Sequence, residues 1–398
     1  MKALPHQVSK ARTLVRKLKL YGLVLFAGEV RSGKTAAFIL AATTITPKHI
    51  VITKKGAIDG VKKFTNNVTN YHQVGKLKPE YDLVVLDECH RYITGYPKRS
   101  KLWKDIYEIT SKAKYIIFSS GTPTPESYAM LFNMLALSLD SPWKKYKKFT
   151  QWHQDYGIYA TKVIGYDEAR GKVRTALDYS QTKDDKILKD IDHLKVSMTR
   201  VEAGHKFEPT DKLHLIPLTT QQEEIVSTIK KSKIYNFNEE YSIVCDTASK
   251  YLQKLHQIAG GFVNAVDLCE QSKVFQVDSN KVKYIQENFN PDDTIILAYY
   301  IPEQEYLASI FPNVGSLTKN SDGVDFSHFK NMVIYSMGFS AATYQQVIGR
   351  QLNFITRTEE VIIHFLISGL DQYVYDAVSS KQNFTTKWYK EKDNGKAI

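Results

Sequence analysis

The sequence predicts an α/β fold of two lobes, each with a mostly parallel sheet flanked by helices, and a helical segment that bridges them. Two observations lead to this prediction. Short apolar runs alternate with helical stretches in the first third of the chain, and again near its end. At 398 residues, the chain has the length of two or three domains. We expect lobes over residues 1–140 and 246–398, with residues 141–245 as a helical insertion or bridge.

The first alternation contains four apolar runs of about five residues, with intervals long enough for a helix between them. Strands of a parallel sheet that is covered on both faces are typically such runs, rich in Val, Ile, Leu and Phe. We therefore expect βα units with strands at Leu23–Ala27, His49–Thr53, Leu83–Asp87 and Tyr115–Ser119.

The second alternation lies between residues 294 and 381. The expected strands are Thr294–Tyr299, Met332–Tyr335 and Val361–Leu366. The expected helices are Glu303–Phe311, Ala341–Phe354 and Asp371–Lys381. The segment between the two alternations is more charged and less regular, which is why we assign it to a bridge.

Charge is distributed unevenly along the chain, whose formal net charge is +12. Residues 1–150 contain 26 Lys and Arg against 10 Asp and Glu, whereas residues 151–398 contain 28 against 32. A basic region beside a nearly neutral one indicates a polyanionic partner such as nucleic acid. The alternative is a solvated basic face that maintains solubility.

The three cysteines cannot form a disulfide framework, and their spacing is not that of a metal site. No segment reaches the ~18 uncharged apolar residues that would span a bilayer, and the N-terminus lacks the pattern of a secretory signal. We therefore expect an intracellular protein in a reducing compartment, with no membrane partner.

Residues 28–35 read GEVRSGKT and match the pattern G-x-x-x-x-G-K-[ST] between an expected strand and an expected helix. Glycines let backbone N–H groups curl round an anion, and the helix N-terminus adds positive potential. We expect Lys34 to reach the β- and γ-phosphates of ATP and the Thr35 hydroxyl to bind Mg²⁺. The expected ATP-binding residues are Gly28, Glu29, Val30, Arg31, Ser32, Gly33, Lys34 and Thr35.

The third apolar run ends in Asp87 and Glu88, and an acidic strand end of this kind completes a phosphate and magnesium site. Asp87 would hold Mg²⁺, partly through water. Glu88 would act as the general base that polarises the attacking water. An isolated Asp-Glu pair is usually an exposed strand end, but here it accompanies the phosphate-binding motif.

The segment Asp87-Glu88-Cys89-His90 resembles the acidic DECH box of superfamily two helicases and nucleic-acid translocases. Further segments resemble motifs of that family, in the family's order. They are residues 4–7 (LPHQ), 50–55 (IVITKK), 119–123 (SSGTP), 322–325 (DGVD) and 346–350 (QVIGR). The resemblance covers most of the chain and is weakest over roughly 150–245.

Within that family, the chain is similar to compact Swi/Snf-type ATPases, especially short versions encoded by bacteriophages. The segments that carry this likeness are Gly121–Ser127, Ser141–Trp143, Met198–Arg200, Thr219–Gln222 and Ile367–Asp371. The likeness implies two RecA-like lobes with ATP in the cleft and nucleic acid across both. It also implies the cytoplasm of a bacterial or phage-infected cell.

The resemblance assigns roles to individual residues. The further ATP contacts it implies are Gln7, which reads adenine, Asp325 and Arg350. The residues it implies for coupling hydrolysis to movement are His90, Ser120, Thr122 and Gln346. The nucleic-acid contacts it implies are Thr53, Lys54 and Lys55, for which a solvated turn is the alternative. Asn70 and Tyr71 are weaker candidates for a similar contact.

One position departs from the family's pattern, because Asn353 stands where a second arginine is usual. The next arginine, Arg357, is about two helical turns beyond Arg350 and about 10 Å further along a helix axis. We expect Arg350 to supply the main transition-state charge and Arg357 to be an auxiliary. The alternative is a surface pair of Arg357 with Glu359 or Glu360.

Residues 143–156 interleave aromatic side chains with four lysines. On one helix, Trp143, Tyr146, Phe149, Trp152 and Tyr156 would form a single stripe, which favours core packing over base stacking. The lysines are the better candidates for nucleic acid. They are Lys144, Lys145, Lys147 and Lys148.

Together these features predict an ATP-dependent DNA translocase or helicase that uses ATP and Mg²⁺. The expected partner is single-stranded, duplex or forked DNA, with a protein partner that supplies specificity, and we expect a monomer. Two alternatives stay open: an RNA helicase, and a nucleic-acid-binding adaptor that switches on ATP binding without hydrolysis.

Overall fold

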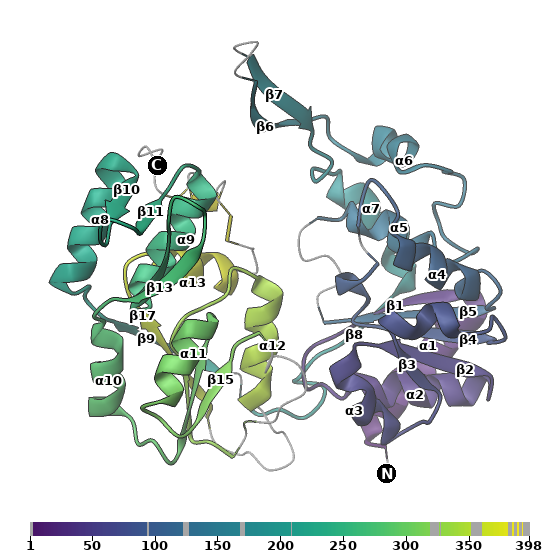
Figure 1. Cartoon of the computed structure of the whole chain (residues 1–398). Helices are drawn as coiled ribbons and strands as arrows, with labels where there is room; N and C mark the ends of the chain where they lie inside the picture. The colour runs from purple at the N-terminus through teal and green to yellow at the C-terminus, as the bar shows by residue number, and fades with distance from the viewer. Residues whose placement is uncertain are drawn as a thin grey trace. The chain divides into compact units, whose positions relative to one another are not determined.

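The computed structural model describes residues 3–351, except 94, 122–126, 168–171, 208, 319–325 and 327, together with residues 360–380, 384–385, 388–389 and 392. The chain divides into two compact units, Met1–His205 and Lys206–Ile398 (Figure 1). Each unit contains a parallel sheet flanked by helices, which confirms the predicted α/β fold class. None of the helices in the described part of the chain is both long and apolar enough to cross a membrane.

Unit 1 is built on a parallel sheet of six strands in the order β3-β2-β4-β5-β1-β8. The strands are β1 (Leu23–Gly28), β2 (His49–Thr53), β3 (Val68–Asn70), β4 (Leu83–Asp87), β5 (Tyr115–Ser120) and β8 (Lys195–Met198). The four predicted runs are β1, β2, β4 and β5. Parallel pairing places β4 between β2 and β5, and β5 next to β1, so their carboxyl ends share one edge of the sheet.

Helices cover both faces of this sheet, which is why its central strands are buried along nearly their whole length. The helices are α1 (Pro5–Tyr21), α2 (Lys34–Ile45), α3 (Ile58–Lys62), α4 (Lys101–Thr110), α5 (Met130–Leu135), α6 (Phe149–Tyr156) and α7 (Asp184–Ile191). On one face, Leu14 of α1 and Phe38 of α2 pack with Val85. On the other, Ile106 of α4 and Trp152 of α6 belong to the same core as Leu86.

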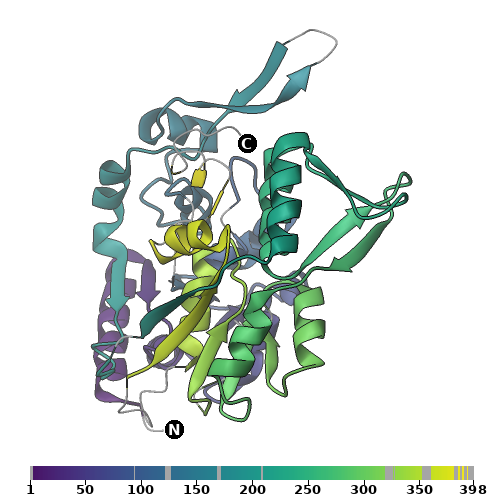
Figure 2. The same cartoon turned by 90° about the vertical axis from the view of Figure 1, so that its left-hand side faces the viewer.

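An antiparallel hairpin of β6 (Thr161–Asp167) and β7 (Lys172–Leu177) projects from unit 1 (Figures 1 and 2). Together with β8, it shows that the segment expected to be a helical bridge also contains strands. The division between the units falls at residue 205, inside that segment. β8 joins the main sheet beside β1 although it has only four residues and begins with Lys195.

Unit 2 is built on a parallel sheet of five strands in the order β15-β14-β16-β17-β9. They are β9 (Thr210–Leu215), β14 (Thr294–Ala298), β15 (Val314–Ser316), β16 (Asn331–Ile334) and β17 (Ile362–Ile367). A second, antiparallel sheet consists of β10 (Ile234–Asn236), β11 (Ser242–Val244), β12 (Phe262–Val266) and β13 (Ser272–Gln276). The three strands predicted in this half of the chain correspond to β14, β16 and β17.

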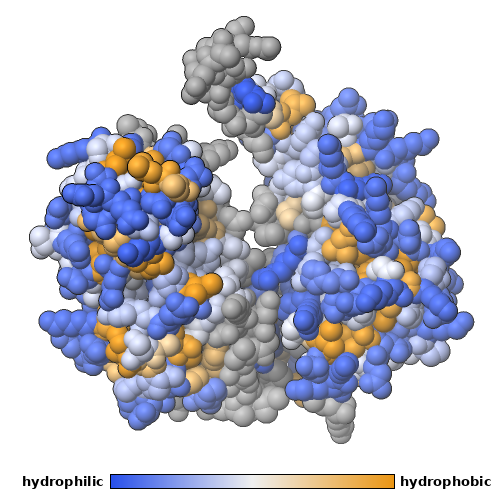
Figure 3. Space-filling view, in the orientation of Figure 1, coloured by the Kyte–Doolittle hydropathy of each residue, from blue (hydrophilic) through white to orange (hydrophobic). Residues whose placement is uncertain are grey.

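The helices in the described part of this unit are α8 (Thr220–Ser232), α9 (Ala248–Ala259), α10 (Asn280–Asn288), α11 (Ile301–Ala308), α12 (Ala341–Gln351) and α13 (Asp371–Ser379). Two cores fill the unit. The larger contains Leu297, Ile363 and Val374, and the smaller contains Ile296 and Val333. On the face shown in Figure 3, polar residues cover much of each unit, with apolar residues interspersed among them, as is usual for protein surfaces.

Candidate active site

The predicted phosphate-binding loop connects β1 to the N-terminus of α2. Gly33 has φ +85° and precedes the first residue of the helix, in the left-handed region that favours glycine. A Cβ at Gly33 would also lie 2.5 Å from Nε2 of Gln7, so a side chain there would have to displace Gln7. The loop therefore has the glycine geometry that the sequence motif requires.

Gln7, expected to read adenine, lies against this loop. It is buried in the first turn of α1, where its Oε1 accepts a hydrogen bond from the Leu4 backbone N–H at 2.9 Å. The Gln7 amide nitrogen faces Gly33. The structure thus brings together two motifs that are about 25 residues apart in the sequence.

The other side of the loop is held by residues that follow β8. The Glu29 N–H donates to the Met198 carbonyl at 2.9 Å, and the Arg200 N–H donates to the Glu29 carboxylate at 2.7 Å. The His205 ring lies 3.3 Å from the Arg31 carbonyl. Residues 198–200 carry part of the family likeness in the sequence, but their position at this loop was not predicted.

Lys34 and Glu88 form an ion pair at the carboxyl edge of the sheet. Lys34 Nζ lies 3.0 Å from Glu88 Oε1, and both side chains are largely buried. Burial opposes the charged form of each group, but their mutual attraction outweighs it. The pKa of Lys34 is raised, and the pKa of Glu88 is lowered to about 2 by the Lys34 ammonium with help from His90. Glu88 is therefore ionised at neutral pH.

Glu88 has a backbone conformation that side chains rarely adopt, with φ 52° directly after β4. Such left-handed conformations of non-glycine residues cost about 1–3 kcal/mol and cluster at functional sites. At Glu88 the chain passes from the end of β4 into the short helical turn Cys89–Arg91. Glu88 Oε2 has no hydrogen-bond partner among the described residues, so this oxygen can accept one.

Asp87 is held by two hydroxyl groups from neighbouring strands. Thr53 Oγ1 donates to Asp87 Oδ2 at 2.9 Å, and Ser119 Oγ donates to Oδ1 at 3.2 Å. Burial raises the pKa of Asp87, and the Lys34 charge opposes that rise. The carboxylate is therefore oriented by its neighbours, as a magnesium ligand would need.

Two residues expected to contact nucleic acid are instead buried beneath this site. Thr53 is fully buried with its hydroxyl on Asp87, and Tyr71 is 1% exposed with its hydroxyl on the Asp87 carbonyl at 2.8 Å. This corrects both expectations, because strand-end position alone did not reveal that Asp87 engages these hydroxyls. Lys54 is also buried, whereas Lys55 is exposed. Asn70 is half-buried and accepts a hydrogen bond from the His72 N–H.

Two of the expected coupling residues meet at this edge. Ser120 Oγ and His90 Nδ1 are 2.7 Å apart, and the same ring nitrogen lies 3.6 Å from Glu88 Oε2. Burial lowers the pKa of His90 to about 4, so the ring is neutral at pH 7. His90 thus connects the carboxylate of Glu88 to the end of β5.

The remaining expected positions are described only in part. Thr122, Asp325, Asn353 and Arg357 lie outside the described residues. Gln346 is buried in α12. Arg350 belongs to the same helix, one residue before its last, and its side chain lies outside the described atoms.

The donors and acceptors at this edge fit a magnesium–nucleotide complex. The Ser32 hydroxyl is fully buried in the loop and has no hydrogen-bond partner among the described residues. Magnesium in such sites takes one or two carboxylates together with phosphate oxygens and water. Asp87 and Thr35 are the residues expected to supply that limited set, and the described residues contain no cluster of three or more His, Cys, Asp or Glu that could hold a metal by itself.

The aromatic residues of the segment 143–156 belong to the core, as their spacing in the sequence predicted. Trp143, Phe149, Trp152 and Tyr156 are all buried, and the Trp143 and Trp152 rings are 5.2 Å apart. The single helix was wrong, because α6 begins at Phe149 and the Trp143 N–H bonds instead to the Ser141 hydroxyl. The four lysines Lys144, Lys145, Lys147 and Lys148 are exposed.

Comparisons with known proteins give weak likenesses in structure only. No family model matches the chain, and neither does any curated protein. The chain is similar to the SWI2/SNF2 ATPase core of Sulfolobus solfataricus, solved with dsDNA, at 13% identity over 96% of this chain and 91% of that one, with a TM-score of 0.40. The same core domain without DNA in its description gives 12% identity, coverages of 96% and 89%, and a TM-score of 0.39.

A further similar structure is the ATP-dependent Type ISP restriction-modification enzyme LlaBIII bound to DNA. The identity is 11% over 92% of this chain, with a TM-score of 0.44. The chain spans only 28% of that enzyme's length. At these identities and TM-scores, a functional conclusion has to rest on the residues of the site.

Proposed function

We propose that this chain is an ATP-dependent DNA translocase or helicase. The observation that carries the proposal is the ion pair between Lys34 of the glycine-rich loop and Glu88 of the acidic strand end, with Asp87 beside it. A lysine at a helix N-terminus binds phosphate. Of two adjacent carboxylates, one can bind magnesium and the other can orient the attacking water. Their meeting at one sheet edge is the arrangement that ATP hydrolysis requires.

The roles follow from the contacts. When ATP binds, Lys34 would leave Glu88 Oε1 and bind phosphate oxygens instead. The Glu88 carboxylate would then be free to orient the attacking water. Before ATP binds, Lys34 holds the pKa of Glu88 at about 2, so the carboxylate that Lys34 releases is already ionised. Thr53 and Ser119 keep Asp87 oriented. Mg²⁺, held by Asp87 and Thr35, would neutralise phosphate charge.

Further residues would connect this centre to nucleotide recognition and to movement. Gln7 lies beside Gly33 of the loop and would contact adenine. Arg350 would add positive charge in the transition state, and Asp325 would contact ATP. His90 and Ser120 transmit the state of Glu88 to the end of β5, since they are hydrogen-bonded to each other.

Nucleic acid as the second substrate is supported by the charge of the first 150 residues and by the exposed lysines of residues 144–148. Contacts of lysine with phosphates are independent of sequence, as movement along a strand requires. DNA rather than RNA is proposed on the Swi/Snf-like segments of the sequence. A monomer would suffice, with specificity supplied by a protein partner.

The test is steady-state ATP hydrolysis without nucleic acid and with single-stranded DNA, duplex DNA, forked DNA or RNA. We expect stimulation by DNA. Displacement of the third strand from a DNA triplex would then distinguish movement along duplex DNA from separation of a fork. Stimulation by RNA alone would favour an RNA helicase, and ATP binding without turnover under every condition would favour a switched adaptor.

A further inference from the structure

A hollow opens at the carboxyl edge of the parallel sheet of unit 2. Its volume is about 570 Å³, within the roughly 300–1,000 Å³ of sites for small organic groups. Its lining contains three aromatic rings and several uncharged polar side chains, among them Tyr299, Tyr300, Phe339, Ser316, Thr318 and Gln253. None of the described residues that line it carries a charge. Ligands of open α/β sheets bind at the carboxyl ends of the strands, and Tyr299 directly follows β14.

Tyr299 presents an aromatic ring to this hollow. The ring is half-buried and lies 4.9 Å from that of Tyr300 and 6.1 Å from that of Phe339, centroid to centroid. Its hydroxyl has no hydrogen-bond partner among the described residues. A Cβ on Gly338 would lie 2.9 Å from Cε2 of Tyr299, so a larger residue at position 338 would move the ring. Neighbouring side chains therefore fix the position of the Tyr299 ring, while its hydroxyl makes no hydrogen bond among the described residues.

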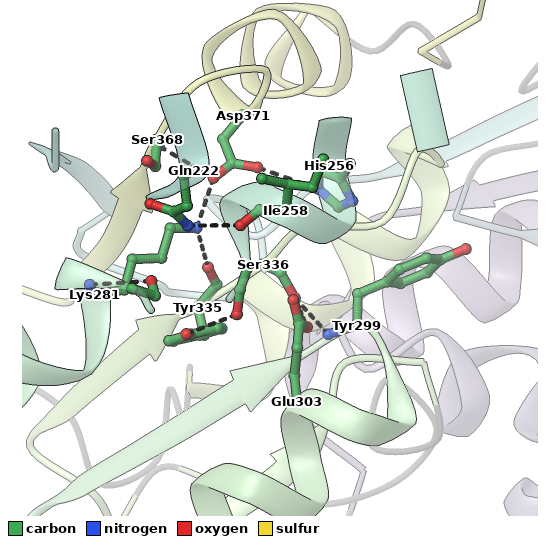
Figure 4. Close-up of polar contacts among 12 residues, drawn as sticks. Gln222, His256, Ile258, Lys281, Tyr299, Glu303, Tyr335, Ser336, Ser368 and Asp371 are labelled. Carbon is green, nitrogen blue, oxygen red and sulfur yellow. Dashed lines mark hydrogen bonds and ion pairs between the residues drawn. The ribbon is translucent and has the colours of Figure 1, made fainter. Parts of the chain in front are cut away.

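A buried ionic network fixes the second ring of the hollow. The Tyr300 hydroxyl lies 3.0 Å from His256 Nδ1, and His256 Nε2 lies 3.2 Å from the Asp371 carboxylate. Lys281 Nζ contacts the other oxygen of Asp371 at 2.6 Å. Figure 4 shows Asp371 between His256 and Lys281, with the Tyr299 ring directed away from them. Tyr300 is thus held by groups that are themselves buried and paired.

A second buried acid anchors the backbone of both tyrosines. The Tyr299 N–H donates to Ser336 Oγ at 2.8 Å, and Ser336 in turn donates to the Glu303 carboxyl. The same Glu303 oxygen accepts the Tyr300 N–H at 3.2 Å. Burying acids and a lysine is expensive, and apolar side chains of similar size would fill this space at lower cost. Rigid polar support of this kind is what preorganised binding sites use.

We propose that this hollow binds an unstacked nucleobase of a single-stranded nucleic acid. The flat face of a base matches the rings of Tyr299 and Phe339, and stacking on aromatic side chains tolerates every base. The hydroxyls of Ser316 and Thr318, which are 3.2 Å apart, and the exposed Gln253 amide lie where the polar edge of a base would be. Because the lining is uncharged, the phosphates stay outside it. The inference rests on the proposed function and adds a base contact to it.

The first experiment compares a dT oligonucleotide with one in which abasic sites replace the bases. Affinity for wild-type protein is measured by fluorescence anisotropy, a measurement that requires no protein variant. Loss of stacking on one aromatic side chain corresponds to a roughly 5- to 150-fold weaker affinity. We expect a loss in that range for the abasic strand, and equal affinities for the two strands would overturn the inference.

The second experiment changes the ring. Tyr299→Ala should weaken binding of intact dT by the same factor, with no further loss when the bases are removed, whereas Tyr299→Phe should keep the wild-type affinity. Tyr306→Ala is the matched control, because Tyr306 follows closely in the sequence, in α11, and is 38% exposed without lining the hollow. Thermal unfolding of each variant verifies that it folds.

Salt and free nucleosides give the last distinctions. The slope of log affinity against log salt should be the same for wild type and Tyr299→Ala, since the substitution leaves every phosphate interaction in place. Saturable binding of free thymidine as tight as that of the strand, and abolished in Tyr299→Ala, would make the hollow a mononucleoside site and overturn the strand assignment. If DNA still stimulates ATP hydrolysis while Tyr299→Ala binds dT normally, the inference fails and the proposed function stands.

Discussion

Lys34 Nζ and Glu88 Oε1 are 3.0 Å apart, although 54 positions separate the two residues in the sequence. The contact joins the helix that follows β1 to the residue that follows β4, across the intervening strand β5. Each charge stabilises the other in a site that burial would otherwise make unfavourable to both. The Lys34–Glu88 pair therefore contributes both to the stability of this sheet edge and to its chemistry. Substituting Glu88 should affect ATP hydrolysis more than ATP binding.

Glu88→Gln should leave ATP binding nearly intact while removing turnover. The amide keeps the shape of the side chain and an oxygen for Lys34, but it cannot act as a base. General-base catalysis contributes about 10²–10⁴-fold, so the rate constant for hydrolysis should fall by that order. Binding of a fluorescent ATP analogue and single-turnover hydrolysis measure the two effects. An equal loss of binding and turnover would contradict the role assigned to Glu88.

Replacing Lys144, Lys145, Lys147 and Lys148 with Ala should weaken DNA binding and flatten its dependence on salt. For duplex DNA, the slope of log affinity against log salt should decrease by ~0.9 for each phosphate that the variant no longer neutralises. The matched control removes four other exposed lysines of unit 1: Lys62, Lys63, Lys76 and Lys78. The same slope in both variants would show that residues 144–148 are only a solvated basic face.

The stability of the chain should fall between pH 5 and 8 because of Glu303. Burial raises the pKa of this carboxyl from its ordinary value of about 4.5 to about 8, with Ser336 and Lys281 opposing the rise and Asp371 adding to it. A raised pKa means that folding retains a proton, so the stabilisation is complete below pH 4.5 and is lost as pH rises through 8. The loss should be on the order of 2–4 kcal/mol.

The measurement is urea unfolding of wild type and Glu303→Gln at pH 5, 6, 7 and 8. The glutamine cannot titrate and still offers an oxygen to Ser336 and to the Tyr300 N–H. Between pH 5 and 8, the free energy of unfolding of Glu303→Gln should therefore fall less with pH than that of wild type. Parallel pH profiles of the two proteins would show that the carboxyl titrates normally.

The strands that could be predicted from the sequence are those whose side chains are buried on both faces of the sheet. The strands β1, β4 and β5 were recognisable because apolar cores cover both of their faces. Strand β8 and the antiparallel sheet were missed because their strands are not continuous buried apolar runs: β8 has an exposed residue between two buried ones, and β13 is mostly exposed. Such strands are made by pairing rather than by burial, and their composition carries little signal.

The site divides in the same way. The glycine-rich loop and the acidic strand end have fixed spacings that reflect their chemistry, so their residues could be named in advance. Thr53 and Tyr71 were assigned to nucleic acid because of their position after a strand. Only the structure shows that their hydroxyls serve Asp87. The partners of a polar side chain depend on which distant residue lies opposite, and local sequence does not encode that.

Arg350→Ala should nearly abolish DNA-stimulated hydrolysis while ATP still binds. The expected helix is present as α12, Ala341–Gln351, and Arg350 belongs to it, whereas Asn353 and Arg357 lie outside the described residues. An arginine that contacts the transferring phosphate is worth about 10³–10⁵ in rate, whereas one that only aids binding is worth far less. Arg357→Ala should therefore reduce the stimulated rate less than Arg350→Ala does. Rapid-quench hydrolysis at saturating ATP and DNA compares them, with Asn353→Arg as a third variant that restores the family's usual pattern. Normal hydrolysis by Arg350→Ala would place the required positive charge elsewhere and would show that residues 346–350 have been matched to the wrong motif.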